Sequence, residues 1–200
     1  MIKYTFIAAV AISALVSCSN GNTSSDANGQ KTSSDSLVLV RPQDIKNPVE
    51  LLSDDWMLLS AGNKENFNEM TIAWGQLGEL WGRPVMTVFV DNLRLTHQFI
   101  EENDYFTVSG FPTVYKNDLQ YLGTHSGRDG DKLSETGLHA AFTQLGNPYF
   151  AEANLVIECK KIYANDFDTS KMIGDFSDFY AKRGSIHTVY IGEIVNVWKK

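Results

Sequence analysis

The sequence His187-Thr188-Val189-Tyr190-Ile191-Gly192-Glu193-Ile194-Val195-Asn196-Val197-Trp198 carries the longest strand pattern in this chain. Val189, Ile191, Val195 and Val197 share one parity, and alternation with a period of two is typical of a β-strand that buries one face. We therefore expect a long strand close to the C-terminus.

Strand-like segments recur along the chain, and short helical segments separate them at irregular intervals. The predicted strands cover residues 56–61, 70–74, 85–90, 105–109, 154–163 and 187–198. The predicted helices cover residues 47–52, 96–102, 114–122, 131–141 and 175–182, with a polar turn at 62–67 and a loop at 75–83 that contains Trp81. Thr96 is the predicted cap of its helix. With no internal repeat and no β–α–β alternation, this order predicts an α+β fold built on a mostly antiparallel barrel.

Composition limits the classes of function. The chain has 200 residues, a formal net charge of −7, a pI of about 5.0 and 43% hydrophobic residues. The acidic balance argues against a nucleic-acid binder and against docking on an anionic membrane by charge alone. The four histidines are scattered without zinc-ligand spacing, so no metal site is predicted. Cys18 and Cys159 lie in different contexts, and we expect Cys159 to be a buried small residue.

The N-terminal segment has the layout of a secretory signal: an early lysine, then the apolar run from Phe6 to Val16, which is too short to span a membrane. Leu15-Val16-Ser17-Cys18 resembles the lipobox of bacterial lipoproteins, in which the cysteine becomes the acylated first residue. We expect a signal peptide at 1–17, a tether at 18–36 with lipidated Cys18, and a folded domain at 37–200 in the cell envelope. An ordinary signal peptide that is cut nearby is the alternative.

A glycine-rich loop, Gly123-Thr124-His125-Ser126-Gly127-Arg128-Asp129-Gly130-Asp131-Lys132, is the strongest candidate for chemistry. Glycines allow backbone N–H groups to form an anion-binding nest, and a predicted helix from Asp131 to Ala141 would add its positive terminus. Arg128 and Lys132 suit a phosphate group. The alternative is a solvated surface turn, and the loop lacks the ending of a Walker motif.

Four stretches in this order resemble the flavin reductase family with the FMN-binding split-barrel fold, across roughly residues 48–198. They are Asn68-Glu69-Met70-Thr71-Ile72-Ala73-Trp74; Arg94-Leu95-Thr96; Ser126-Gly127-Arg128 with Asp131-Lys132; and Glu158-Cys159 with His187-Thr188-Val189-Tyr190-Ile191-Gly192-Glu193-Ile194. The resemblance implies a mostly antiparallel split β-barrel with short peripheral helices. It also implies a homodimer, with FMN at or near the subunit interface.

The resemblance implies a set of cofactor-binding residues. They are Asn68, Met70, Thr71, Ile72, Ala73, Trp74, Arg94, Thr96, Ser126, Gly127, Arg128, Lys132 and His187. The loop residues and Lys132 would hold the phosphate, with Arg94 and Thr96 adding a cation and a hydroxyl. Thr71 and the backbone of residues 70–73 would meet the edge of the flavin ring, and Trp74 or Trp81 would cover one face of the ring.

Simpler interpretations remain for several of these residues. The side chains of Met70, Ile72 and Trp74 would then belong to the core, and His187 at a strand start would lie at the surface or an interface. Trp81 would be either a core residue or part of a ligand lid or dimer contact.

Members of this family commonly transfer a hydride from NADH or NADPH to flavin, and others are electron carriers. The sequence therefore predicts a flavin reductase-like oxidoreductase with FMN as cofactor and NAD(P)H or a protein as electron donor. No catalytic residue is assigned, because the cofactor carries the redox chemistry. A location outside the cytoplasm is difficult to reconcile with a nicotinamide donor. The alternatives are a tethered, non-catalytic binder of flavin, haem or another planar ligand, and a cofactor-free interaction module.

Overall fold

The computed structural model describes residues 36–45 and 47–200. The predicted signal peptide, the lipidation site at Cys18 and all of the predicted tether except Ser36 lie outside these residues. Within them, no helix is long and apolar enough to cross a membrane.

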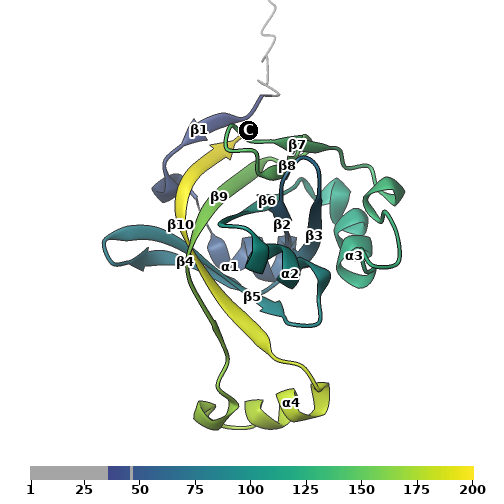
Figure 1. The fold of residues 1–200 in the computed structure, drawn as a ribbon. Helices are drawn as coiled ribbons and strands as arrows, with labels where there is room; N and C mark the ends of the chain where they lie inside the picture. Colours follow the sequence, from purple (N-terminus) through teal and green to yellow (C-terminus); the bar gives the residue numbers. More distant parts are fainter. Residues whose placement is uncertain (1–35, 46) are drawn as a thin grey trace, which may run out of the picture. The chain divides into compact units, whose positions relative to one another are not determined.

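The strands form one large antiparallel sheet and one small hairpin (Figure 1). In the large sheet the order is β3-β2-β6-β9-β10-β5-β4, with β1 paired to β10, and the sheet does not close on itself. The expected α+β architecture with a mostly antiparallel, split-barrel-like sheet and short helices is confirmed. The strands are β1 (Val38–Val40), β2 (Met57–Gly62), β3 (Phe67–Ile72), β4 (Gly75–Leu80), β5 (Arg83–Asp91), β6 (Tyr105–Gly110), β7 (Ala140–Phe142), β8 (Pro148–Phe150), β9 (Leu155–Asp166) and β10 (His187–Lys199).

The helices are short and lie between strands. They are α1 (Pro48–Glu50), which continues as a π-helical turn at Leu51–Asp55; α2 (Leu95–Glu102); α3 (Lys116–Thr124); and α4 (Phe176–Arg183). Single 3₁₀ turns occupy Pro42–Asp44, Thr113–Tyr115, Leu133–Glu135 and Thr169–Lys171.

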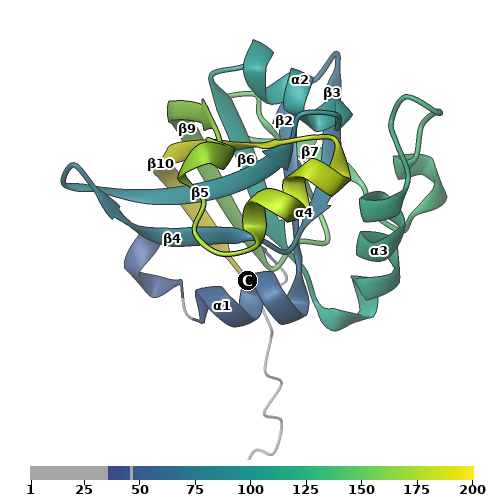
Figure 2. The same cartoon turned by 90° about the horizontal axis from the view of Figure 1, so that it is seen from below.

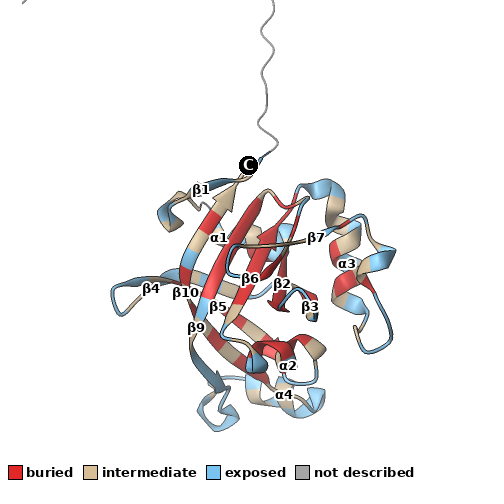
Figure 3. Cartoon of the chain, turned by 45° about the horizontal axis from the view of Figure 1, so that its top comes forward, coloured by how far each residue is buried: buried red, intermediate tan, exposed pale blue. Residues whose placement is uncertain are grey.

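The central strands β2 and β6 of the large sheet are buried on both faces. In β2, Met57 and Leu59 belong to one hydrophobic cluster, whereas Leu58 between them belongs to another. We call the face of the first cluster the inner face and the opposite face the outer face. Helix α2 packs on the inner cluster through Phe99 and Ile100. Figure 3 shows the buried residues concentrated along β2, β6 and β9. The outer cluster, which α3 and the β7–β8 hairpin cover, consists of Leu58, Phe111, Leu119, Leu122, Leu138, Phe150, Ala153 and Val156.

The long strands β9 and β10 extend beyond the rest of the sheet and carry α4 at their ends (Figures 1 and 2). The guanidinium of Arg183 donates to the Asp91 carboxylate at 2.6 Å, and Ser185 donates to the same oxygen at 2.7 Å. Phe89 and Phe167 stack with ring centroids 5.5 Å apart. These contacts fix the α4 segment against β5.

The predicted loop at 75–83 is wrong, because these residues form β4 and the first residue of β5. Trp81 and Gly82 connect the two strands with positive φ angles of 55° and 71°. Two consecutive residues in this region form a turn whose twist matches an antiparallel hairpin. Trp81 lies at the tip and is 70% exposed, so it is not a core residue.

The predicted helix at 131–141 is also wrong. Only the turn Leu133–Glu135 is helical, and Ala140 begins β7. The Asp131 carboxylate accepts from the backbone N–H groups of Leu133 and Ser134 at 3.2 and 3.3 Å. An acidic side chain that bonds the backbone two and three residues ahead stabilises the start of a helical turn. The turn ends at Thr136, whose backbone is extended with φ −120° and ψ 168°, so the predicted α-helix beside the glycine-rich loop is reduced to a single turn.

Three smaller expectations need correction. Thr96 lies inside α2, whose N-cap is Arg94, so Thr96 does not cap the helix. Trp74 lies beyond the end of β3 at Ile72 and is 52% exposed, so it is not a core residue. His187 is buried and not a surface residue. Cys159 is buried as predicted, and burial raises the pKa of its thiol.

Candidate functional site

A polar cavity of about 220 Å³ lies where the start of α2 meets the end of α3 and the glycine-rich loop. Segments that are far apart in the sequence supply its walls. Predicted site residues in the lining are Asn68, Arg94, Thr96, Ser126, Gly127 and Lys132; the others are Leu93, Leu95, Thr124 and His125. The structure thus brings together six of the predicted cofactor-binding residues.

Gly127 is packed so closely that any larger residue would require a neighbouring side chain to shift. A Cβ atom at this position would lie 2.2 Å from Oδ1 of Asn68 and 3.0 Å from a Leu95 methyl group. The Asn68 side-chain amide donates to the Thr96 hydroxyl at 2.7 Å and to the Glu69 carbonyl at 3.1 Å. The loop backbone, β3 and α2 are therefore held in contact at this point.

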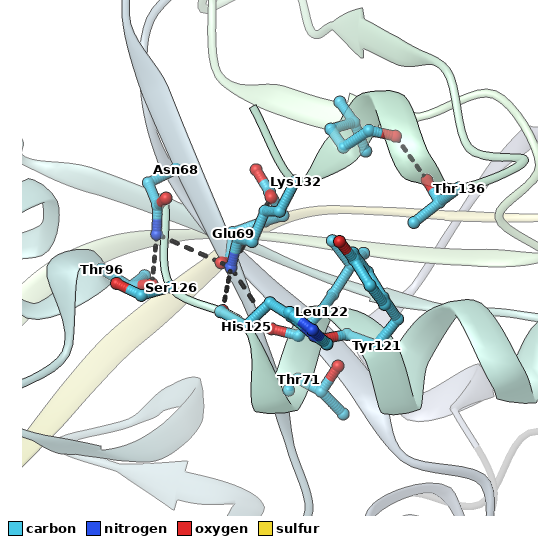
Figure 4. Close-up of polar contacts among 12 residues, drawn as sticks. Asn68, Glu69, Thr71, Thr96, Tyr121, Leu122, His125, Ser126, Lys132 and Thr136 are labelled. Atoms are coloured by element: carbon cyan, nitrogen blue, oxygen red, sulfur yellow. Dashed lines mark hydrogen bonds and ion pairs between the residues drawn. The ribbon is translucent and has the colours of Figure 1, made fainter. Parts of the chain in front are cut away.

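Lys132 is the buried centre of this arrangement, as Figure 4 shows. Its ammonium donates to the Glu69 carbonyl at 2.5 Å, to the Leu122 carbonyl at 3.2 Å and to the His125 carbonyl at 3.5 Å. It also lies 3.7 Å from the Glu69 carboxylate. Leu122 and His125 belong to the C-terminal end of α3, where a cation is favoured. Because these acceptors match its three N–H donors, Lys132 first of all holds the loop to β3 and α3.

Burial governs the electrostatics of the cavity. It lowers the pKa of Lys132, against the effect of Glu69, and it raises the pKa of Glu69, against the effect of Lys132. It also lowers the pKa of Arg94. With Lys132 and Glu69 paired, Arg94 leaves the cavity with a positive balance. An anion that approaches a partly desolvated guanidinium forms a strong charge-assisted hydrogen bond.

The N-terminus of α2 adds to this positive character. No side chain caps the helix, and the first N–H groups of any helix have no partner within the helix. The Arg94 guanidinium donates to the Gly123 carbonyl at 2.8 Å, which orients it beside these groups. Arg128 is exposed and donates to the Leu93 carbonyl at 2.9 Å, so it braces the loop outside the cavity lining. A phosphate group fits this donor set.

A second cavity, of about 430 Å³, is mostly apolar and lies between α1, β4 and the end of β3. It is lined by Pro48, Val49, Leu52, Ser53, Ala73, Trp74, Gly75, Gln76, Leu77 and Phe89. The Trp74 ring lies 5.3 Å from the imidazole of His187, which is within hydrogen-bond distance, 3.1 Å, of the Tyr180 hydroxyl. Burial lowers the pKa of His187. Ala73 and Trp74 thus line an apolar surface that suits a flat ring, and His187 lies beside Trp74.

The side chains of Met70, Thr71 and Ile72 line neither cavity. Met70 and Ile72 lie in the inner core, as their alternative interpretation predicted. The Thr71 hydroxyl donates to the Leu119 carbonyl at 2.5 Å. Contact between the backbone of this strand and a flavin ring stays a prediction.

Sequence reasoning missed Glu69 as part of this site. The sequence analysis places Glu69 only within the motif that runs from Asn68 to Trp74. The available signal is a carboxylate directly before a predicted strand, since such a group needs a partner if it is buried. Lys132 is that partner.

Comparison with known proteins identifies the class. Residues 52–200 match the family described as the flavin reductase like domain, and the chain belongs to this family. No curated protein matches the chain.

Solved structures share the fold at low sequence identity. The chain is similar to a flavoredoxin from Methanosarcina acetivorans, with 22% identity, a TM-score of 0.58, and coverage of 73% of this chain and 68% of that chain. An FMN-binding domain of a flavin reductases-like enzyme from Shewanella baltica OS155 has 20% identity, a TM-score of 0.60, and coverage of 82% and 77%. An NADH:FAD oxidoreductase from Streptomyces globisporus C-1027, in complex with NAD and FAD fragments, has 19% identity, a TM-score of 0.55, and coverage of 82% and 87%.

Proposed function

We propose that this protein binds FMN and acts as a flavin-dependent oxidoreductase that passes electrons from a reduced donor to flavin or another acceptor. The observation that carries the proposal is the polar cavity, where Arg94, Ser126 and the uncapped start of α2 present donors to one small volume. Membership of the flavin reductase-like family supports the same assignment.

The residues have distinct roles in this proposal. Arg94, the Ser126 hydroxyl and the first amides of α2 bind the phosphate group. Lys132 and Asn68 position the loop, and Gly127 allows the loop backbone to approach. When bound, the flavin supplies the electron-transfer chemistry.

The ring of the cofactor would lie on an apolar surface that includes Trp74. The partly exposed indole and the apolar residues around it exclude water from one side of the ring. His187, with a lowered pKa, is neutral near pH 7 and adds no charge to this surface.

We further propose that the protein is a lipoprotein anchored through Cys18 on the outer side of a bacterial membrane. The lipobox-like sequence before Cys18 and the polar segment after it support this location. In that compartment a protein donor is favoured over NADH or NADPH. A homodimer that shares the flavin between subunits belongs to the same proposal.

Spectroscopy of the purified full chain tests the proposal. We expect a yellow protein, or a colourless one that takes up added FMN, with absorption bands that disappear on addition of dithionite. An Arg94→Gln variant should bind FMN more weakly while it keeps the same circular dichroism. A chain that neither carries nor takes up FMN would overturn the proposal and favour a cofactor-free module.

Stopped-flow mixing then separates the classes of activity. Rapid bleaching of bound flavin by NADH or NADPH would identify a reductase. Bleaching only by dithionite or a reduced protein would identify an electron carrier. A bound flavin that no physiological donor reduces would favour the tethered binder.

A further inference from the structure

A third cavity, of about 520 Å³, lies on the outer face of the sheet, beside β1 and the connection between β7 and β8. It shares no lining residue with the two cavities described above. Its lining consists of Leu37, Leu39, Phe142, Thr143, Gln144, Leu145, Tyr149, Glu158, Asn196 and Trp198. The volume lies within the range of ordinary small-molecule sites.

Glu158 is the one charged residue of this lining, and it is fully buried. Its Oε1 accepts from the Thr143 hydroxyl at 2.5 Å and from the Asn147 amide at 2.7 Å, and its Oε2 accepts from the Asn196 amide at 2.7 Å. All three donors are neutral. None of the ion pairs within residues 36–45 and 47–200 includes Glu158. The hydrogen bonds stabilise the carboxylate, but no neighbouring cation balances a negative charge on it.

Aromatic rings form much of the remaining wall. Phe142, Tyr149 and Trp198 supply three aromatic rings to the lining, and the faces of aromatic rings attract cations. Within the described part of the chain, no hydrogen bond engages the Tyr149 hydroxyl or the Trp198 indole N–H. Leu145 is 55% exposed, which places an apolar side chain at the opening of the cavity. The cavity therefore combines an unbalanced carboxylate, aromatic faces and polar groups without partners.

We propose that this cavity is a second ligand site, which takes a small organic cation: a substituted ammonium with an apolar or aromatic body. The Glu158 carboxylate lies behind Thr143 and Asn196, so it attracts the ligand through its charge and not through a direct hydrogen bond. The aromatic walls contact the ammonium methyl groups and the apolar body. The same charge excludes carboxylate and phosphate ligands from this cavity. The proposal is independent of the flavin assignment.

Calorimetric titration of the full chain with a matched set of probes tests the charge preference. The probes are benzyltrimethylammonium, its uncharged isostere neopentylbenzene, and the anion phenylacetate. We expect the cation to bind at least about tenfold more tightly than the isostere, and phenylacetate not to bind. Equal affinity for cation and isostere, or no binding of the cation at millimolar concentration, would overturn the proposal.

Variants locate the binding. Glu158→Gln removes the charge and keeps an oxygen that accepts from Thr143 and Asn147, while the new NH2 group donates to the Asn196 side-chain oxygen once that amide turns over. It should weaken cation binding at least about tenfold. Leu145→Lys places a cation at the exposed opening and should weaken binding as well, whereas the neutral control Leu145→Gln should have little effect. Because Leu145 is exposed, this pair remains informative if Glu158→Gln does not fold.

FMN binding tests whether the cation site is separate from the proposed flavin site. Benzyltrimethylammonium should not displace FMN, and Leu145→Lys should leave FMN affinity unchanged. Displacement of FMN by the cation, or unaltered cation binding in both Glu158→Gln and Leu145→Lys, would place the ligand elsewhere and contradict the proposal.

Discussion

Two buried carboxylates, Glu69 and Glu158, lie on the same face of the same sheet and are stabilised differently. They lie in one row of residues that crosses four neighbouring strands. Glu69 in β3 is opposite Ser60 in β2, Ser60 is opposite Thr107 in β6, and Thr107 is opposite Glu158 in β9. Glu69 has the Lys132 ammonium 3.7 Å away. Glu158 has neutral donors only.

This difference determines the sign of the net charge at the cavity beside each of the two carboxylates. At Glu69 the paired charges cancel, and the nearby Arg94 leaves a cavity that favours anions. None of the ion pairs in the described part of the chain includes Glu158, and we propose that the adjacent cavity favours cations. A buried carboxylate therefore does not define a ligand by itself; its nearest partners do.

The largest expected effect is on the free energy of unfolding of variants that remove the Lys132 ammonium or the Glu158 charge. Lys132→Met leaves a buried carboxylate and three backbone carbonyls without their donor, so we expect a loss of roughly 3–5 kcal/mol in the free energy of unfolding. Glu158→Gln keeps an acceptor for Thr143 and Asn147 and gives Asn196 a donor for its side-chain oxygen, so it should cost about 1 kcal/mol or less. Urea unfolding measures both. Equal losses would mean that Lys132 is not the central contact of its site.

The next largest effect concerns the phosphate. Arg94→Gln should weaken FMN binding by about 1.5–3 kcal/mol, because a charge-assisted hydrogen bond is lost. Arg128→Gln is the matched control and should have a smaller effect, since this guanidinium is exposed and donates to the Leu93 carbonyl. Fluorescence titration with FMN measures both affinities. A larger effect from Arg128 than from Arg94 would move the phosphate to the outer side of the loop.

Gly127→Ala should cost about 1–3 kcal/mol of stability, because the added methyl group cannot fit without a shift of Asn68 or Leu95. It should also weaken FMN binding, since the Asn68–Thr96 contact shapes the cavity. Gly78→Ala is the control, as a Cβ there meets nothing within 4 Å. Thermal unfolding compares the two. A neutral Gly127→Ala would show that the loop is not closely packed in solution.

The smallest expected effect is a pH dependence at His187. Burial holds its folded-state pKa below the unfolded value of about 6.5, so the unfolded state binds more protons between these two values. Stability should therefore fall as the pH decreases below about 6.5. Unfolding at pH 7.5 and 5.5 should show a smaller difference in His187→Gln than in the parent chain. An unchanged difference would assign the dependence to other groups.

Local pattern predicted most of the strands and several helices. The alternation in β10 and the β-branched run in β5 were sufficient, because a half-buried strand needs apolar residues at a fixed period. The β4–β5 hairpin was missed, since its turn depends on a tryptophan with positive φ, which sequence patterns do not favour. The helix predicted at 131–141 is a single turn, because the backbone becomes extended at Thr136.

The candidate site was predicted as a set of residues and not as an arrangement. Glycine spacing and basic residues indicated the loop, and the structure brought it to Arg94 and Thr96. No local pattern indicates that Lys132 donates to carbonyls of β3 and α3, or that Arg128 lies outside the cavity lining. These outcomes depend on which strand ends and helix ends meet.

The sequence alone determined the sheet-based class and the resemblance to the flavin reductase family, because periodicity and short motifs are local properties. Tertiary structure alone decided which cation neutralises which carboxylate. Glu69 is 63 residues from Lys132, and Glu158 is 38 residues from Asn196, so only the packing of strands and helices determines these pairs.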